Sequence, residues 1–142
     1  MAAISLAERQ DFLRMAEGHF RELNPAFEPQ DDWKENYFER VMARSRTFAR
    51  WITLDGQRIG FILFGLEEHR FLPRLKGWIY ELYVLPEFRR QGVARICAVQ
   101  AIHELEERAA SKIELEVMEG NSPARRLWLS LGFHKVSERY VR

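Results

Sequence analysis

The chain has 142 residues and a mass of 16.9 kDa, with 46% hydrophobic and 30% charged residues, values typical of a single globular domain over residues 1–142. Its 22 basic and 21 acidic residues leave a net charge of +1, which gives no support to bulk attraction toward nucleic acid or a membrane. A lone cysteine, Cys97, excludes an internal disulfide, and the N-terminus lacks a signal peptide, so we expect a cytoplasmic protein.

The first part of the chain predicts two amphipathic helices. Ser5 and Glu8 fit a capping box that begins a helix over about 6–23. After a loop, Asp32 and Glu35 can cap a second helix, in which apolar residues again recur at helical spacing. The apolar faces consist of Phe12, Ala16, Phe20 and Leu23 in the first helix and of Trp33, Tyr37, Phe38, Val41 and Met42 in the second.

Strands and helices alternate through the remainder of the chain. An Asp55-Gly56 turn joins the first two strands as a hairpin. The predicted strands span about 47–54, 58–66, 77–84, 112–117 and 133–141, and the predicted helices run from Gly92 to about Ala110 and over 122–131. This order predicts an α/β fold of the α+β type, in which an antiparallel hairpin leads into a partly parallel, mixed sheet flanked by helices.

Two arginines and a glycine stand where the strand over 77–84 gives way to a helix. A helix N-terminus offers unpaired N–H donors and the positive end of the helix dipole, and Gly92 lets a ligand approach the backbone closely. The segment therefore fits an anion cradle, although a capped and solvated helix start has the same pattern. The cradle would consist of Arg89, Arg90, Gln91, Gly92, Val93 and Ala94.

A second segment makes the interpretation of the first segment more specific. Asn121 follows a strand, Ala124 and Leu127 lie on a short helix, and Gly132-Phe133 follows that helix. The first segment contributes Val84, Pro86, Arg89, Gly92 and Ala94. At their mutual distance, over about 60 residues, the two segments resemble the GNAT superfamily of N-acetyltransferases.

The resemblance implies an acyl-CoA N-acyltransferase fold with acetyl-CoA as co-substrate. Main-chain groups of Leu82, Tyr83 and Val84 would pair with the pantetheine arm like an added strand, and the N–H groups of the cradle would hold the pyrophosphate. Asn121 would touch the cofactor near its pantetheine, or else only cap the helix that follows. The implied reaction is direct transfer of an acetyl group to a primary amine in one ternary complex.

Three residues bear on the chemistry. Glu81 is a lone carboxylate in an apolar strand, and the resemblance makes it the base; the alternative is a structural partner for an arginine or lysine. Glu116 corresponds to the base of some family members, but its alternation with apolar neighbours also fits a half-exposed strand. Trp128 stands where the family has a tyrosine that is usually assigned as the acid, and indole has no useful acidity. A non-catalytic acyl-CoA-binding or regulatory module is therefore the second reading.

The acceptor is left open by the sequence. Acidic and aromatic residues in the regions that wall the family's acceptor site favour a cationic amine: a small molecule, a peptide N-terminus or a lysine side chain. These residues are Glu28, Asp31, Asp32, Trp33, Glu35, Tyr37, Glu67 and Glu68. The histidines lack metal-ligand spacing, so we expect no metal. Few residues precede the first helix, which leaves a sheet edge that a partner subunit would cover in a homodimer.

Overall fold

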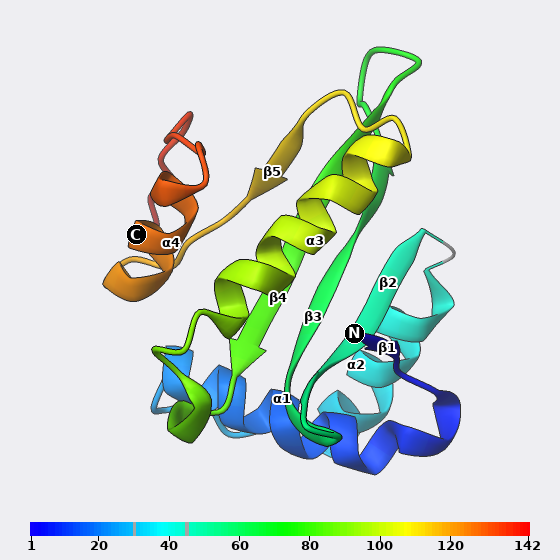
Figure 1. Cartoon of the computed structure of the whole chain (residues 1–142), viewed down its shortest axis with the longest axis vertical. Helices are drawn as coiled ribbons and strands as arrows, with labels where there is room; N and C mark the ends of the chain where they lie inside the picture. Colours follow the sequence, from blue (N-terminus) through cyan, green and yellow to red (C-terminus); the bar gives the residue numbers. More distant parts are fainter. Residues whose placement is uncertain (30, 45) are drawn as a thin grey trace.

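The computed structural model describes residues 1–29, 31–44 and 46–142 and contains a five-stranded sheet in the order β1-β2-β3-β4-β5 (Figure 1). The strands are β1 (Ala2–Ala3), β2 (Thr47–Leu54), β3 (Gln57–Glu68), β4 (Leu75–Val84) and β5 (Ile113–Leu115). The helices are α1 (Arg9–Leu23), α2 (Asp31–Ala43), α3 (Val93–Glu107) and α4 (Ser122–Ser130), and short 3₁₀ turns lie at Leu6–Glu8 and Pro86–Phe88.

The sheet is mixed, as the sequence predicts. Strands β1 to β4 pair antiparallel in chain order, and β5 pairs parallel with β4. The turn between β2 and β3 is tight because Asp55 and Gly56 both adopt positive φ, 50° and 79°, which suits the right-handed twist of a hairpin. The predicted hairpin and the α+β fold class are therefore confirmed.

Both faces of the sheet are covered, which explains the continuous apolar run in β3. Phe61 and Leu63 pack with α1 and α2, whereas the alternate residues Ile62 and Phe64 pack with α3. Figure 1 shows α3 lying across β3 and β4 on one face and α1 crossing behind the lower ends of the strands. None of the helices in the described ranges is long and apolar enough to cross a membrane.

The predicted last strand over 133–141 is wrong. Residues 133–142 carry no strand, and the segment begins with Phe133 donating its N–H to the Trp128 carbonyl. Val136, Tyr140 and Val141 are exposed. Alternating apolar residues make a strand only where a neighbouring strand supplies hydrogen-bond partners, and no strand of the described chain pairs with this segment.

The other differences concern the ends of elements. The first predicted helix opens as a 3₁₀ turn, where the Glu8 carboxylate accepts a hydrogen bond from the Ser5 N–H at 2.8 Å. Helix α3 ends at Glu107 rather than near residue 110, since Ala109 adopts a positive φ of 64°. The opening strand is two residues long and covers only part of the edge of β2, as expected from the few residues before the first helix.

Candidate active site

A β-bulge in β4 sets the position of Glu81. Leu63 of β3 lies opposite Glu81 and Phe64 lies opposite Ile79, so Tyr80 is the extra residue on β4. An extra residue reverses the alternation of side chains along a strand, and after the bulge Tyr83 packs in the core beneath α1 and α2. The bulge thereby turns the Glu81 side chain toward α1.

The Glu81 carboxylate meets a histidine from α1. Nε2 of His19 lies 2.5 Å from Oε2 of Glu81. The His19 residue is 8% exposed, and its ring lies edge-on to Phe61 and beside Tyr83 at centroid distances of 5.8 and 5.1 Å. The sequence offered a structural alternative in which Glu81 pairs with an arginine or a lysine. The observed partner is instead a histidine. The side chain of Glu81 is 24% exposed, so the carboxylate is still open to solvent or a ligand.

Three buried side-chain donors have no hydrogen-bond partner among the described residues. One is Nε of Arg9 on α1, and the other two are the hydroxyl of Tyr37 on α2 and the indole Nε1 of Trp78 on β4. Burial raises the pKa of Tyr37, and the negative charge of Glu81 raises it further, so the hydroxyl stays protonated as a donor. Buried polar groups are paired in most proteins, so the lack of a partner is unusual here; all three atoms are covered in this structure, and we assign them no contact with a substrate.

Beyond the bulge, the outer edge of β4 has no partner strand in the described parts of the chain. Pairing with β5 ends at Ile79 opposite Leu115. Leu85 donates its N–H to the Ile59 carbonyl of β3. The N–H and C=O groups of successive strand residues point to opposite edges, so those of Leu82 and Val84 point to the outer edge of β4.

The main-chain groups predicted to hold pantetheine are therefore not equivalent. The Tyr83 carbonyl faces β3, where a Cβ on Gly60 would lie 2.0 Å from its oxygen. The Val84 carbonyl accepts a hydrogen bond from Arg89 Nε at 2.8 Å. Leu82 and the N–H of Val84 are the groups that fit the predicted pairing best.

The cradle has the geometry of an anion site. Arg90 and Gly92 adopt positive φ values of 64° and 78°, and nothing lies within 4 Å of a Cβ placed on Gly92. Alternating conformations of this kind turn successive N–H groups into one concavity. The first helical bond of α3 runs from the Ile96 N–H to the Gly92 carbonyl, so the N–H groups of residues 93–95 have no helical acceptor. The segment can therefore bind a phosphate group through its backbone.

The Arg89 side chain is held against α1. Its guanidinium makes two hydrogen bonds to Glu22 of α1, at 2.6 and 2.8 Å, and lies over the ring of Tyr83. Hydrogen bonding to Arg89 lowers the pKa of Glu22, against the opposing effect of burial. The Arg89 charge is thus neutralised, and its side chain ties the cradle to α1 rather than adding free positive charge to it.

The remaining predicted residues lie on the segment after β5. Glu116 is exposed just beyond the end of β5. Asn121 caps α4, since its Oδ1 accepts a hydrogen bond from the Ala124 N–H at 3.3 Å. Trp128 is 7% exposed and packs edge-on against Phe133 in the core that α4 shares with α3. The structure places Trp128 as a packing residue.

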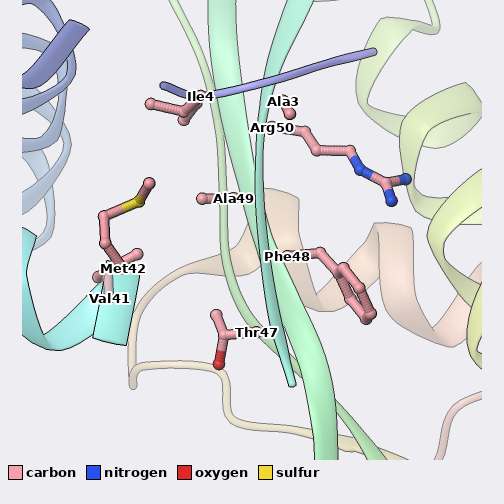
Figure 2. Close-up of a pocket in the computed structure, with 8 residues that line it drawn as sticks. All are labelled: Ala3, Ile4, Val41, Met42, Thr47, Phe48, Ala49 and Arg50. Carbon is pink, nitrogen blue, oxygen red and sulfur yellow. The ribbon is translucent and has the colours of Figure 1, made fainter. Parts of the chain in front are cut away.

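A separate hollow lies on the same face of the sheet as Glu81, at the edge formed by β1 and β2. Figure 2 shows it between α2 and the outer strands, with Met42 and Ala49 on its wall and Arg50 turned away toward α3. Its volume is about 210 Å³. Strands β1 and β2 lie at the opposite edge of the sheet from β5. Apart from Thr47 and Arg50 its lining residues are apolar, and Glu81 is not among them, so we do not assign the hollow to the site.

His19 is the site residue that sequence reasoning missed. Phe12, Ala16, His19 and Leu23 follow one another at helical spacing, so the histidine lies on the apolar face of the first helix. A histidine on such a face needs a buried partner, and this signal was available in the sequence.

Comparisons with known proteins agree with the geometry. A sequence model described as the acetyltransferase (GNAT) family matches residues 9–133. An uncharacterized N-acetyltransferase of Archaeoglobus fulgidus is 33% identical over 122 residues, which cover 84% of this chain and 82% of the relative. An N-alpha-acetyltransferase of Sulfurisphaera tokodaii is 32% identical over 90 residues, which cover 58% of this chain and only 54% of the relative.

A solved structure extends the likeness to the fold as a whole. The ribosomal-protein-alanine N-acetyltransferase of Brucella melitensis biovar Abortus 2308 superposes with a TM-score of 0.79. The superposition covers 99% of this chain and 95% of that chain at 20% sequence identity. At this identity the likeness shows the fold alone.

Proposed function

The chain belongs to the GNAT family of acetyltransferases, and we propose that it transfers an acetyl group from acetyl-CoA to a primary amine by direct attack within a ternary complex. The observation that carries the proposal is the arrangement along β4. Its free outer edge runs from the bulge at Tyr80 and Glu81 to Val84, and the cradle at Gly92 follows that end of the strand. A phosphate group, an extended arm and a reacting carbonyl can therefore be held in sequence along one strand.

Each part of the site has a role in this proposal. The N–H groups of the cradle bind the pyrophosphate, and the main chain of Leu82 pairs with the pantetheine arm. Acetyl-CoA supplies the thioester. Glu81 accepts a proton from the attacking amine as the N–C bond forms and the C–S bond breaks, and the sulfur leaves with the electron pair. Trp128 can donate a hydrogen bond but no proton, so in this proposal water protonates the thiolate, and the proton that Glu81 took from the amine neutralises the hydroxide left behind.

The names of the relatives favour one acceptor class among those that the sequence leaves open. One relative is an N-alpha-acetyltransferase, and the superposed structure is a ribosomal-protein-alanine N-acetyltransferase. We therefore propose a peptide N-terminus as the acceptor, ahead of a small-molecule amine. A non-catalytic acyl-CoA-binding module is not favoured, because the curated relatives carry the names of acetyltransferases.

The cradle gives the first test. Acetyl-CoA at about a hundred times its Kd should stabilise the fold by about 2.7 kcal/mol and so raise the melting temperature. Gly92→Glu should abolish this shift, because it places bulk and negative charge where the pyrophosphate would lie.

Gly56→Glu is the matched control. Gly56 has almost the same φ, 79° against 78°, and the same open surroundings, so both variants suffer similar backbone strain. The control should keep the acetyl-CoA shift. A folded Gly92→Glu protein with an unchanged shift would rule out the cradle as the cofactor site.

A further inference from the structure

We propose that His19 is a positioning residue for Glu81, holding one carboxylate oxygen so that the other faces the acceptor amine. This role rests on the proposed function, since it concerns the proton that the amine loses. His19 contacts Glu81 directly, with Nε2 2.5 Å from Oε2, and so acts on the reaction through that carboxylate.

The surroundings of His19 fix its ring. The residue is buried on α1, and Phe61 and Tyr83 of the sheet lie against the ring at 5.8 and 5.1 Å. Phe20, the next residue on α1, lies at 5.2 Å. A ring packed on several sides has few rotamers available, so the direction of its Nε2–H is set by packing rather than by the hydrogen bond alone.

The charged and titratable groups around the pair leave Glu81 as the natural acceptor. Glu22 lies one turn after His19 on α1, but its carboxylate is bound by both terminal nitrogens of Arg89. Tyr37 of α2 and Tyr83 of β4 both have a raised pKa, chiefly because they are buried, so each hydroxyl is neutral. Among the described groups around the pair, the carboxylate of Glu81 is therefore the acceptor for a proton on Nε2 of His19.

The consequence for the reaction follows from the two oxygens of a carboxylate. Oε2 of Glu81 accepts from His19, which restrains the rotation of the carboxyl group. Oε1 is then presented to the amine, and it takes the amine proton as the N–C bond forms and the C–S bond breaks. A loose carboxylate would spend less time in this orientation, and an error of about 1 Å in the position of a reacting group can cost about a hundredfold in rate.

Two variants of equal polarity separate this role from simple packing. In His19→Gln the side-chain amide nitrogen can reach the position of Nε2 and donate to Glu81, whereas the shorter amide of His19→Asn cannot. We expect His19→Gln to keep kcat within about threefold of wild type and His19→Asn to lower it about tenfold to a hundredfold, up to the loss that a misplacement of about 1 Å can cause. The KM for acetyl-CoA should change in neither variant, since the cradle is untouched.

The controls use the same chain. His103 is exposed on α3 and pairs with Glu107, so His103→Asn should leave kcat unchanged. The double variant His19→Asn, Glu81→Gln should be no slower than Glu81→Gln alone, because a residue that acts through Glu81 has no effect once the base is gone. Melting temperatures of all variants report whether each is folded.

The outcomes are distinct. If wild type releases thiol but His19→Asn matches it in kcat, or if folded His19→Gln is as slow as His19→Asn, the positioning role is wrong and the proposed function stands. A double variant far slower than Glu81→Gln would also overturn the role. If wild type releases no thiol with any amine, the proposed function fails, and the role of His19 fails with it.

Discussion

Burial of Glu81 costs free energy, because a carboxylate among apolar strand residues must be hydrated, paired or used in function. His19 pairs one oxygen, and the 24% exposure of the side chain keeps part of the group open. Glu81 is therefore anchored without being enclosed. This combination suits a base, which needs both a fixed position and access to its substrate.

Glu81→Gln tests the base at the scale of one residue. The amide keeps the shape of the side chain but cannot accept the amine proton, so turnover should fall about a hundredfold or more while acetyl-CoA still raises the melting temperature. Steady-state release of free thiol measures the rate.

Glu116→Gln is the control for that experiment. Glu116 is exposed beyond β5 and is the second candidate base from the sequence, so its variant should turn over like wild type. Equal rates in Glu81→Gln and wild type would exclude Glu81. A loss in Glu116→Gln alone would assign the base to that residue.

At the scale of elements, an ion-pair group fastens α3 to the sheet. Arg50 of β2 makes two hydrogen bonds to Glu104 of α3, one of them at 2.7 Å, and Arg108 makes two more to the same carboxylate. Arg50 also lies over the rings of Phe48 and Phe64, at 5.4 and 5.1 Å. Since the side chains of Arg50 and Glu104 are both partly buried, at 22% and 21% exposed, this contact should contribute more than a fully exposed surface pair.

Glu104→Gln should therefore lower the free energy of unfolding by about 1–3 kcal/mol at neutral pH. Hydrogen bonding to Arg50 holds the pKa of Glu104 below its ordinary value of 4.5, against the opposing effect of burial. A lowered folded-state pKa stabilises the protein above the unfolded-state value, and this contribution is lost as the pH falls through the folded-state value. The difference between wild type and variant should thus be largest at neutral pH and shrink in acid, below about pH 4.

Urea unfolding at several pH values measures this dependence. Glu107→Gln is the control, because Glu107 is 65% exposed and its variant should stay within about 0.5 kcal/mol of wild type. A difference for Glu104→Gln that stays constant from neutral to acid pH would contradict the electrostatic account.

The elements also show which features a sequence can predict. The hairpin at Asp55 and Gly56 follows from local turn chemistry, and the start of α3 at Gly92 follows from helix signals. The prediction of the last strand is wrong because alternating apolar and polar residues show that a segment can form a strand, not that a partner strand is present. Asn121 caps α4, which was the alternative to a cofactor contact. A cap does not exclude a ligand contact through the rest of the amide.

Contacts between elements could not be predicted from the sequence pattern. The bulge at Tyr80 depends on the register of β3 against β4, and no local signal marks it. The pairing of His19 with Glu81 joins residues 62 positions apart, and that of Glu22 with Arg89 joins residues 67 apart. The sequence could predict that Glu81 needs a partner, but only the fold decides which one.

For the molecule as a whole, β4 and α1 organise the site together. The middle of β4 carries Glu81, and the segment after its end carries the cradle. Helix α1 contacts both, through His19 at Glu81 and through Glu22 at Arg89. The proposed sites for base and cofactor are therefore held by one helix, which should keep their separation constant. A homodimer stays a prediction.

Turnover is the measurement that tests the proposed function most directly. Purified protein is mixed with acetyl-CoA and, in separate reactions, with a peptide that has a free N-terminus, the same peptide with a blocked N-terminus, and small primary amines, and free thiol is followed with time. We predict saturable thiol release that requires an amine, is fastest with the free peptide and is absent with the blocked one. Tight binding of acetyl-CoA without thiol release in any reaction would contradict the proposal and would leave a binding module in its place.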